Sequence, residues 1–396
     1  MGMIKLANIN ECTGCKACMT TCGRNAISFE YDNSTLHYYP VVDKTKCVEC
    51  GRCISKCPAL NINVIKQTRN DYHTKSFCAW NNNEEERHNS TSGGLGMAIS
   101  KWAISLNYLV VGAAFDQHWY LSHSIATNES EISRFCGSKY LISDMAPALS
   151  EIVKRIKEGE NVLFIGTPCQ CEAVKAVVPS SHQDNVITCS IICHGVNSAL
   201  VWEDYVAFLE KKYKSKLMSY NFRSKCKGWG KLFVSYSFEN NKRFVERARV
   251  NIFHSWFGHH YMLRPSCFKC SYRTRERFTD LVIGDFWGID QVISDLDTSE
   301  GVSVLIVNSS KGENFIQGCE SINLIETNFE KTISVLKGFI SSQTYEDISI
   351  ETENAKKFAV DYNNMSFEKM AKTYKPESLF KSIVVFIKST LSRLYE

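Results

Sequence analysis

Two runs of four cysteines stand close to the N-terminus and use eight of the 18 cysteines in the chain. The first run has the pattern C-x2-C-x2-C-x3-C, and the second repeats it with a proline directly after its last cysteine. This is the ligand spacing of a bacterial ferredoxin with two [4Fe–4S] clusters, in which the fourth cysteine of each run reaches across to the other cluster. We therefore predict one cluster on Cys12, Cys15, Cys18 and Cys57, and a second on Cys47, Cys50, Cys53 and Cys22.

Other uses of cysteine explain this pattern less well. A zinc ribbon needs two C-x2-C pairs, so the additional cysteines in each run would have no role. A disulfide framework forms in an oxidising compartment, and the N-terminal residues lack the apolar stretch of a secretory signal peptide. The first run ends in Cys22-Gly23 instead of Cys-Pro, which adds an N–H group near the cluster and removes no ligand. The spacing therefore indicates a protein that moves electrons one at a time.

The composition places broad limits on the chain. Its 396 residues are enough for two or three domains, because a single core rarely extends beyond about 300 residues. The net charge of +4 is small and no long basic run occurs, which argues against a nucleic-acid partner. The sequence contains no uninterrupted apolar stretch of about 18 residues, so we expect no membrane-spanning segment. So many thiols in a chain without an export signal are typical of a reducing cytosol, and we therefore expect a cytoplasmic location.

Hydrophobic patterning divides the chain into four segments. We expect a ferredoxin module over residues 1–65, a linker or exposed loop over 66–90, a larger domain over 91–325 and a helical extension over 326–396. Two stretches of the module, 26–31 and 38–43, have the composition of short strands. In the larger domain, buried strands alternate with helices. The predicted fold is an α+β ferredoxin-type module, then an α/β domain with a mixed, largely parallel sheet, then a helical C-terminal tail.

The last part of that tail, residues 379–394, has the pattern of a basic amphipathic helix. Some helices of this kind lie on a membrane surface. Docking on the same chain or on a partner is the more common arrangement, and it is the one we expect here.

A second group of cysteines lies at the ends of predicted strands. Cys169 follows Pro168 directly after a buried strand, and a proline at this position favours the start of a helix. Cys193 follows the next buried strand. The carboxyl ends of such strands form the usual ligand-binding edge of an open α/β sheet. A separate C-x2-C pair, Cys267 and Cys270, comes later in the chain.

Six short segments stand in a fixed order between about residues 75 and 325: Ser92-Gly-Gly-Leu, Gly137-Ser-Lys-Tyr140, Gly166-Thr-Pro-Cys-Gln170, Cys193-His-Gly195, Asn221-Phe-Arg-Ser-Lys225 with Gly228-Trp229, and Cys267-x2-Cys270 leading to Gly284-Asp-Phe-Trp-Gly288. Together they resemble the coenzyme F420 hydrogenase/dehydrogenase beta-subunit family, whose members carry FAD and iron–sulfur clusters. The fused N-terminal ferredoxin module resembles members found in bacterial polysaccharide gene clusters.

The resemblance implies a third [4Fe–4S] cluster on four cysteines of these segments, Cys169, Cys193, Cys267 and Cys270. Four thiolates are also the number that such a cluster needs. Cys171, Cys189 and Cys226 lie near the same segments and are alternative ligands. Without the resemblance, the cysteines fit a catalytic thiol at Cys169, a zinc site on the C-x2-C pair, and small buried side chains elsewhere.

The resemblance also implies FAD. No G-x-G-x-x-G follows a strand, so a Rossmann dinucleotide site is not indicated. The glycine-rich turn before a helix offers N–H groups to a pyrophosphate, and the next segment offers a hydroxyl, a cation and an aromatic ring. The candidate flavin contacts are Ser92, Gly93, Gly94, Gly137, Ser138, Lys139 and Tyr140. Considered without the family, the same two segments are equally well explained as a helix cap and a surface turn.

Two other groups of residues are less informative. The histidines His254, His259 and His260 lie in an aromatic helical stretch, where packing and surface roles are more common than metal binding. Arg273 and Arg277, with an arginine between them at position 275, follow the C-x2-C pair and face either an anionic group or solvent.

These features predict an iron–sulfur flavoprotein oxidoreductase. Electrons would pass between an external one-electron carrier or partner redox enzyme, the clusters and FAD, to or from a small-molecule substrate, because a flavin links one-electron to two-electron chemistry. The substrate is not identified, and neither is a catalytic residue, since a fold does not fix its substrate. The rival interpretations are a non-catalytic electron-transfer subunit and a flavin-less relative in polysaccharide assembly.

Overall fold

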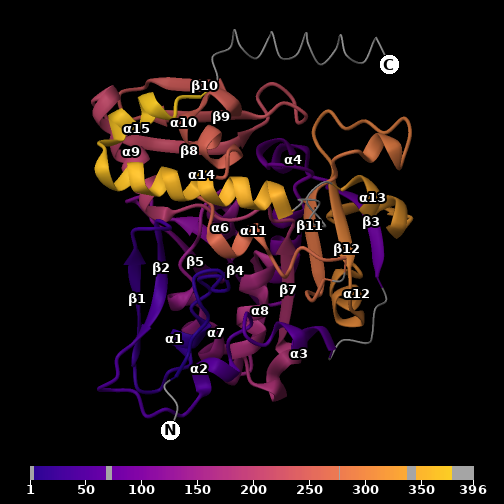
Figure 1. The fold of residues 1–396 in the computed structure, drawn as a ribbon. Helices are drawn as coiled ribbons and strands as arrows, with labels where there is room; N and C mark the ends of the chain where they lie inside the picture. The colour runs from indigo at the N-terminus through magenta and orange to yellow at the C-terminus, as the bar shows by residue number, and fades with distance from the viewer. Residues whose placement is uncertain (1–3, 68–73, 276, 337–344, 377–396) are drawn as a thin grey trace.

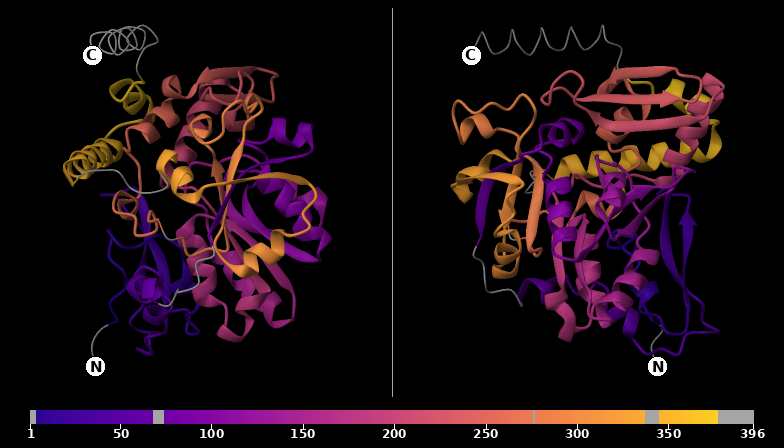
Figure 2. Two further views of the ribbon diagram at one scale, coloured as in Figure 1. Left: turned by 90° about the vertical axis from the view of Figure 1, so that its right-hand side faces the viewer. Right: turned by 180° about the vertical axis from the view of Figure 1, so that it is seen from behind.

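The computed structural model describes residues 4–67, 74–275, 277–336 and 345–376. Its strands form three sheets, of two, three and eight strands (Figure 1). The two-stranded sheet belongs to the cysteine-rich N-terminal module, the eight-stranded sheet forms a central α/β layer, and the three-stranded sheet packs with the C-terminal helices (Figure 2). This arrangement confirms the predicted fold class.

The cysteine-rich module repeats one short unit twice. Its elements are α1 (Ala17–Thr20), β1 (Ile27–Asp32), β2 (His37–Val42), α2 (Arg52–Ser55) and α3 (Ile62–Gln67). The two strands pair in antiparallel fashion, which confirms the two predicted strands. The residue before each of the first two helices has a positive φ, 62° at Lys16 and 71° at Gly51. The chain therefore turns sharply between the second and third cysteine of each run.

The eight-stranded sheet is parallel in one part and antiparallel toward both edges. In spatial order its strands are β13 (Ile322–Thr327), β3 (Lys75–Asn81), β12 (Ser303–Val307), β11 (Leu281–Asp285), β7 (Val186–Ile191), β6 (Asn161–Gly166), β4 (Tyr108–Phe115) and β5 (Leu121–Ala126). Neighbouring strands from β11 to β4 are parallel, and the other pairs are antiparallel. The loops that follow β6, β7 and β11 therefore open at the same edge of the sheet.

Helices cover both faces of this sheet. The helices of the layer are α4 (Glu84–Asn89), α5 (Leu95–Ser105), α6 (Glu129–Ile132), α7 (Ala146–Lys157), α8 (Pro168–Val177), α12 (Ser310–Ile316) and α13 (Phe329–Val335). Alternate strand residues point to opposite faces: Val110 packs in the core under α5 and α12, whereas Val111 packs under α7 and α8. Both faces of the strands are therefore buried, as the continuous hydrophobic runs in their sequences require.

The three-stranded sheet carries an aromatic core. Its elements are α9 (Ala199–Tyr213), β8 (Leu217–Ser224), β9 (Phe233–Phe238), β10 (Arg243–Arg247), α10 (Ile252–Gly258), α11 (Pro265–Phe268), α14 (Tyr345–Asn364) and α15 (Phe367–Thr373). Trp202 and Trp256 are fully buried in this core, together with Phe358 and Met370 from the two last helices. The C-terminal extension is therefore helical in its described part, and its helices pack on the body of the protein.

The N-terminal module packs directly on the α/β layer. Ala17 is fully buried in the core that α7 and α8 form, and Leu36 is buried in the aromatic core. Lys16 forms an ion pair of 2.7 Å with Asp144. Burial alone would raise the pKa of Asp144, but hydrogen bonds from Lys16, Tyr120 and a backbone amide hold it below its usual value. The module and the layer form one packed body.

The structure differs from the expected linker over residues 66–90. Residues 75–81 form β3, which is hydrogen-bonded on both sides, and Cys78 and Ala79 in it are fully buried. Because polar residues flank this short strand on both sides, its hydrophobic segment is too short to indicate a strand in the sequence. The predicted amphipathic helix over 379–394 lies outside the described residues.

Candidate cluster sites and cofactor cavity

Four cysteines line one cavity at the end of the module that faces the α/β layer, and we call it the inner cluster site: Cys12, Cys15, Cys18 and Cys57. Burial raises the pKa of Cys15 to about 12, and the nearby thiols of Cys12 and Cys57 add to this rise. Such a thiol is protonated in water but gives up its proton to a metal ion. The donor set therefore fits a cluster, whose iron would replace four protons.

The other four cysteines of the two runs line a second cavity, the outer cluster site: Cys22, Cys47, Cys50 and Cys53. The amide of Ala26 donates a hydrogen bond of 3.3 Å to the sulfur of Cys22. Cys50 is exposed, and the side chains of Arg24 and Arg52 line the same cavity. Each site thus combines three cysteines of one run with the fourth cysteine of the other run.

Neither site resembles a site for a single ion. Among the described residues, no three His, Cys, Asp or Glu side chains converge closely enough to hold one metal ion. A cubane binds its four thiolates through four different iron atoms, so its ligands stand farther apart than those of one ion. The four cysteines around each cavity match the number of thiolates that one cubane requires.

A third group of cysteines comes together from three parts of the chain, and we call it the third cysteine group: Cys169, Cys193, Cys267 and Cys270. Burial raises the pKa of Cys169 to about 12, with Cys270 and Cys267 contributing. Burial also raises the pKa of Cys193, and the other three thiols add to that rise. The four thiols therefore lie near one another.

The local sequence explains how two of these cysteines reach the group. Thr167 and Gln170 form a capping box at the start of α8, in which the Gln170 side chain accepts a hydrogen bond of 2.9 Å from the Thr167 amide. Cys169 lies inside this cap. Gly195 has a φ of 147°, and a Cβ atom there would stand 3.2 Å from the Cβ atom of Cys267. Glycine thus lets the loop after β7 approach Cys267 closely.

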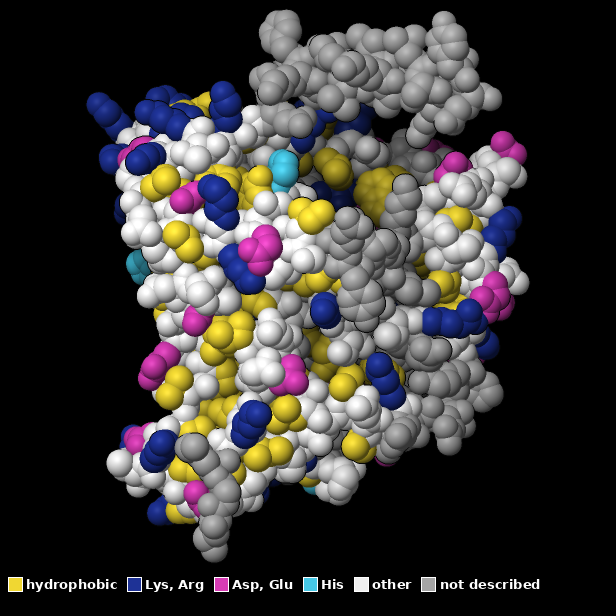
Figure 3. All heavy atoms as spheres, in the orientation of Figure 1, with side chains coloured by type: hydrophobic (Ala, Val, Ile, Leu, Met, Phe, Trp, Pro, Cys, Tyr) yellow, Lys and Arg dark blue, Asp and Glu magenta, His cyan; other side chains and the backbone are white. Residues whose placement is uncertain are grey.

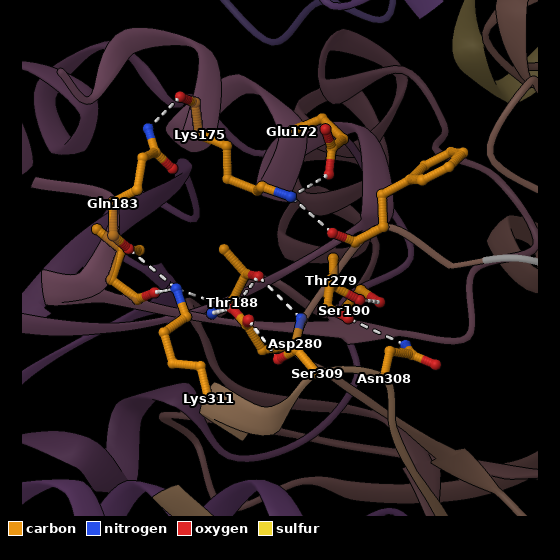
Figure 4. Close-up of polar contacts among 12 residues, drawn as sticks. Glu172, Lys175, Gln183, Thr188, Ser190, Thr279, Asp280, Asn308, Ser309 and Lys311 are labelled. Carbon is orange, nitrogen blue, oxygen red and sulfur yellow. Dashed lines mark hydrogen bonds and ion pairs between the residues drawn. The ribbon is translucent and has the colours of Figure 1, made fainter. Parts of the chain in front are cut away.

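A buried polar network fixes α8 and the neighbouring strands (Figure 4). Asp280, directly before β11, accepts hydrogen bonds from the amide and the hydroxyl of Thr188, at 2.8 and 2.7 Å, and from Ser309 at 2.7 Å. Lys175 on α8 donates to the carbonyl of Phe278 at 2.7 Å. These contacts hold the helix that carries Cys169 against the chain segment that follows the C-x2-C pair.

The three alternative ligands lie elsewhere. Cys171 and Cys189 are fully buried in the hydrophobic cores on the two faces of the sheet. Cys226 is exposed. In this arrangement Cys171 and Cys189 are small apolar side chains, and the third cysteine group has four members without them.

The arginines near the C-x2-C pair take different positions. Arg273 and Arg277 are buried, with exposed fractions of 9% and 4%, whereas Arg275 pairs with Glu330 at the surface. Burial lowers the pKa of Arg277 to about 10, while Cys270 and Cys193 act in the opposite direction. Two cations therefore stand beside the third cysteine group, as an anionic cluster would require.

Of the histidines, His254 is buried and bonded to a backbone carbonyl at 3.0 Å, as a packing residue would be. His259 directly follows α10 and bonds the carbonyl of Ser255 in that helix, at 2.7 Å. His260 instead bridges Glu351, at 2.9 Å, and His194, at 2.5 Å. His194 directly follows Cys193 in the sequence, so His260 is linked to the loop that carries this cysteine.

A cavity of about 300 Å³ opens at the carboxyl ends of β6, β7 and β11. Gly166, Ile191 and Asp285, which end these strands, are among its lining residues. This is the position at which open α/β sheets bind their ligands, and the volume lies in the usual range for small-molecule sites. Thr167 and Gln170 also line the cavity, so its wall directly adjoins Cys169.

Six of the candidate flavin contacts line this cavity: Ser92, Gly94, Gly137, Ser138, Lys139 and Tyr140. Gly93 does not, because it packs between two strands, where a Cβ atom would stand 2.7 Å from the carbonyl oxygen of Ala79. The first turn of α5 lines the cavity and carries no side-chain cap. Its amide groups are therefore suited to bind a phosphate.

Lys139 has a structural contact that its sequence position does not reveal. Its ammonium group donates to the carbonyls of Arg134, Phe135 and Cys136, at 3.2, 2.9 and 2.9 Å. Burial lowers the pKa of this lysine to about 8. The lysine therefore stabilises the turn at one side of the cavity. Ser138 is likewise bonded to Thr91, at 3.1 Å through its amide.

A charged cluster forms around Asp285, which lines the cavity, and the sequence predictions assign it no role. Arg223 donates to the carboxylate of Asp285 at 3.1 Å, and Trp229 donates to the same carboxylate at 2.9 Å. Trp229 also stacks on Trp287, with 4.6 Å between ring centroids. Arg223 further contacts the hydroxyl of Tyr140 at 3.5 Å. The signal was present, because Arg223 and Asp285 both lie in segments that carry the family resemblance.

Comparisons with known proteins match two separate parts of the chain. Residues 11–61 match the 4Fe-4S dicluster domain, and residues 159–332 match the family described as the C terminus of the beta subunit of coenzyme F420 hydrogenase/dehydrogenase. A protein of Methanocaldococcus jannaschii, the uncharacterized protein MJ1349, is 24% identical over 199 residues, which are 44% of this chain and 54% of that protein. The match thus spans about half the length of that relative.

The comparison with solved structures gives a further match. It is a chain of the F420-reducing [NiFe] hydrogenase complex from Methanosarcina barkeri, with 16% sequence identity and a TM-score of 0.44. The match covers 74% of this chain and 92% of that chain. The two domain matches confirm the family resemblance and the iron–sulfur character of the N-terminal module.

Proposed function

We propose that this chain, which joins a 4Fe-4S dicluster domain to a domain of the coenzyme F420 hydrogenase/dehydrogenase beta-subunit family, is an iron–sulfur flavoprotein oxidoreductase. Its cofactors are two clusters in the N-terminal module, a third [4Fe–4S] cluster on the third cysteine group, and FAD in the cavity at the strand ends. The observation that carries the proposal is that Cys50 of the outer cluster site is exposed, whereas Cys169 of the third cysteine group stands in sequence between Thr167 and Gln170, which line this cavity.

The outer cluster site is the entry point for electrons. Cys50 is exposed, and the neighbouring Val48 has an exposed fraction of 57%. In the space-filling view, hydrophobic side chains gather with Lys and Arg on the surface at the lower left, over the N-terminal module (Figure 3). An external one-electron carrier can thus approach the outer site closely.

The inner cluster site is placed to relay electrons to the third cysteine group. The side chain of Tyr272 is buried and lies near both sites. Burial raises the pKa of its hydroxyl, and Cys169 of the third cysteine group and Cys15 of the inner cluster site add to this rise. That hydroxyl has no hydrogen-bond partner among the described residues. It is therefore available to donate to a cluster sulfur on either side.

The cavity supplies what a flavin and a small substrate need. The uncapped start of α5 binds the phosphates, and Tyr140 provides an aromatic ring in the wall. When bound, FAD accepts two electrons one at a time and gives them to a substrate together with a proton, as a hydride. The pair of Arg223 and Asp285 stands at the cavity and can orient a polar substrate.

All 18 cysteines are free thiols in the structure. Among the described residues, no helix has the length and hydrophobicity needed to cross a membrane.

The metal and flavin content of anaerobically purified protein tests the proposal. Three clusters require about twelve iron and twelve sulfide per chain, and the flavin should approach one FAD per chain. Cys169→Ser should lose about a third of the iron, because serine is a poor iron ligand. Cys171→Ser is the matched control, since this cysteine lies two positions away but packs in the core, and it should lose none.

Other results would contradict parts of the proposal. About eight iron atoms per chain, unchanged in Cys169→Ser, would exclude the third cluster. Protein that binds no flavin after anaerobic reconstitution would leave an electron-transfer subunit as the function. One equivalent of zinc would instead assign Cys267 and Cys270 to a structural metal site.

A further inference from the structure

An arginine from outside the N-terminal module extends its side chain into that module. Arg264 directly precedes α11, the helix that carries Cys267, and its side chain is 1% exposed. Its Nε atom donates to the carbonyl oxygen of Cys12 at 2.7 Å. One terminal nitrogen lies 3.5 Å from the sulfur of Cys12 and 3.0 Å from the carbonyl oxygen of Tyr38. The guanidinium group also lies over the ring of Tyr39, 4.4 Å from its centroid.

The backbone of the same residue contacts the third cysteine group. The amide of Cys267 donates a hydrogen bond of 2.8 Å to the carbonyl oxygen of Arg264. One residue therefore bonds a ligand of the inner cluster site through its side chain and a ligand of the third cysteine group through its backbone. This is a short connected path between the two candidate clusters.

The N-terminal module leaves space for this side chain. Gly14, in the first cysteine run, has a φ of 73°, and a Cβ atom there would stand 3.0 Å from Cζ of Arg264 and 2.7 Å from Ile142. A larger residue would therefore displace the guanidinium group from Cys12. The glycine of the first run is required both by the turn and by the approach of Arg264.

The guanidinium group has no acidic partner among the described residues. A buried charge without a partner is costly, so buried cations are normally found beside an anion. A [4Fe–4S] cluster on four thiolates is such an anion, and its reduction adds one negative charge. A cation that donates a hydrogen bond to a ligand sulfur stabilises the reduced form most, and this raises the reduction potential.

We propose that Arg264 is the positioning residue that couples the inner cluster to the third cluster. It provides the counter-charge that raises the potential of the inner cluster, and it holds the two clusters at a fixed separation. The first part rests on the dicluster domain alone, and the second part rests on the third cluster of the proposed function. The pathway runs from Cys12 through Arg264 to Cys267.

An EPR-monitored redox titration of holoprotein variants tests the proposal. Arg264→Met keeps most of the volume and removes the charge and the hydrogen bonds. We expect the midpoint potential of one N-terminal cluster to fall and that of the other to stay constant. A tenfold change in the reduced-to-oxidised ratio at a fixed potential corresponds to about 59 mV for this one-electron couple. We expect a change of at least this size.

Two further variants make the test specific. Arg264→Lys keeps the charge, so it should lower the midpoint potential of the inner cluster by less than Arg264→Met does. It replaces the methionine variant if that variant fails to fold. Lys311→Met is the control, because this lysine donates to the carbonyls of Gln183 and Val186 and pairs with Asp280 instead of a cysteine. It should leave both potentials unchanged.

The outcomes separate the proposal from the function on which it rests. A folded Arg264→Met protein with wild-type iron content and unchanged potentials would overturn the role of Arg264. A potential shift with a normal rate of electron transfer to a third cluster would overturn the coupling role. A wild-type protein with only eight iron atoms would refute the third cluster, and the shift at the inner cluster would still be expected.

Discussion

The two cluster sites of the N-terminal module share one ligand spacing but have different surroundings. The inner site packs against α7 and α8, and Ala17 beside it is fully buried in their core. The outer site has an exposed cysteine and two arginines in its wall. The sequence repeat alone predicts two equivalent clusters. The structure shows that the environment of each site, and not the ligand pattern, distinguishes them.

This difference assigns different tasks to the two sites. An exposed cluster exchanges electrons readily with a carrier in solution, whereas a buried cluster next to other redox groups suits internal transfer. The inner site also carries the contacts that join the module to the rest of the chain, through Lys16 and Arg264. Loss of the inner cluster should therefore affect the whole protein, and loss of the outer cluster should affect mainly the uptake of electrons.

The largest expected effect comes from removing one ligand from each site. Cys15→Ser and Cys50→Ser should each lose up to four iron atoms per chain. Because metal binding contributes to folding free energy, the inner variant should also lower the midpoint of thermal unfolding of the whole chain. The outer variant should leave that midpoint nearly unchanged. Iron analysis and thermal unfolding measure both effects, and equal destabilisation by the two variants would refute the distinction.

A smaller effect is expected from apolar side chains of the same module. Leu36 is 1% exposed and packs in the aromatic core of the other part of the chain. Leu36→Ala should reduce the free energy of unfolding by about 2–5 kcal/mol, as for other buried leucines. Val48, at the outer site, is 57% exposed. Val48→Ala should therefore change the free energy of unfolding by less than about 0.5 kcal/mol. Similar losses in denaturant titrations would mean that the module is not docked as described.

Acid should weaken the docked side of the module. His37 donates to the carbonyl of Met262 at 3.2 Å, and burial, with Arg264, holds its pKa well below the usual value. The unfolded chain takes up a proton near pH 6.5 that the folded chain cannot bind, so stability is complete above that pH and declines below it. Between pH 7.5 and 5.5 this residue should account for a loss of about 1.4 kcal/mol.

The variant His37→Gln keeps a hydrogen-bond donor but does not titrate. Between pH 7.5 and 5.5, its free energy of unfolding should therefore fall by about 1.4 kcal/mol less than that of the wild type. Identical pH dependence in the two proteins would show that His37 is not held in its neutral form.

Parts of this arrangement follow from the sequence, and parts do not. The cysteine spacing determines the two N-terminal sites. The length and periodicity of the hydrophobic segments, and the residues that end them, locate most strands of the central sheet. Strand β3 was missed because seven residues between polar segments give too short a hydrophobic signal. The contact between Arg264 and Cys12 joins residues 252 positions apart, and no local sequence pattern predicts such a pair.

The third cysteine group illustrates the same limit. Its members come from the start of α8, the loop after β7 and the region of α11, so only the family resemblance could join them before the structure was known. The role of Lys139 was not predictable either, because its sequence context does not show the three carbonyls that surround its ammonium group.

The central claim is that electrons enter at the outer site and reach the flavin through the inner site. Stopped-flow reduction by a one-electron donor, followed at the flavin absorbance, tests it directly in FAD-loaded wild-type, Cys50→Ser and Cys171→Ser proteins. The wild type and Cys171→Ser should show rapid bleaching of the flavin, and Cys50→Ser should be slower by at least tenfold. Bleaching at the wild-type rate in a Cys50→Ser protein that lacks the outer cluster would contradict the account.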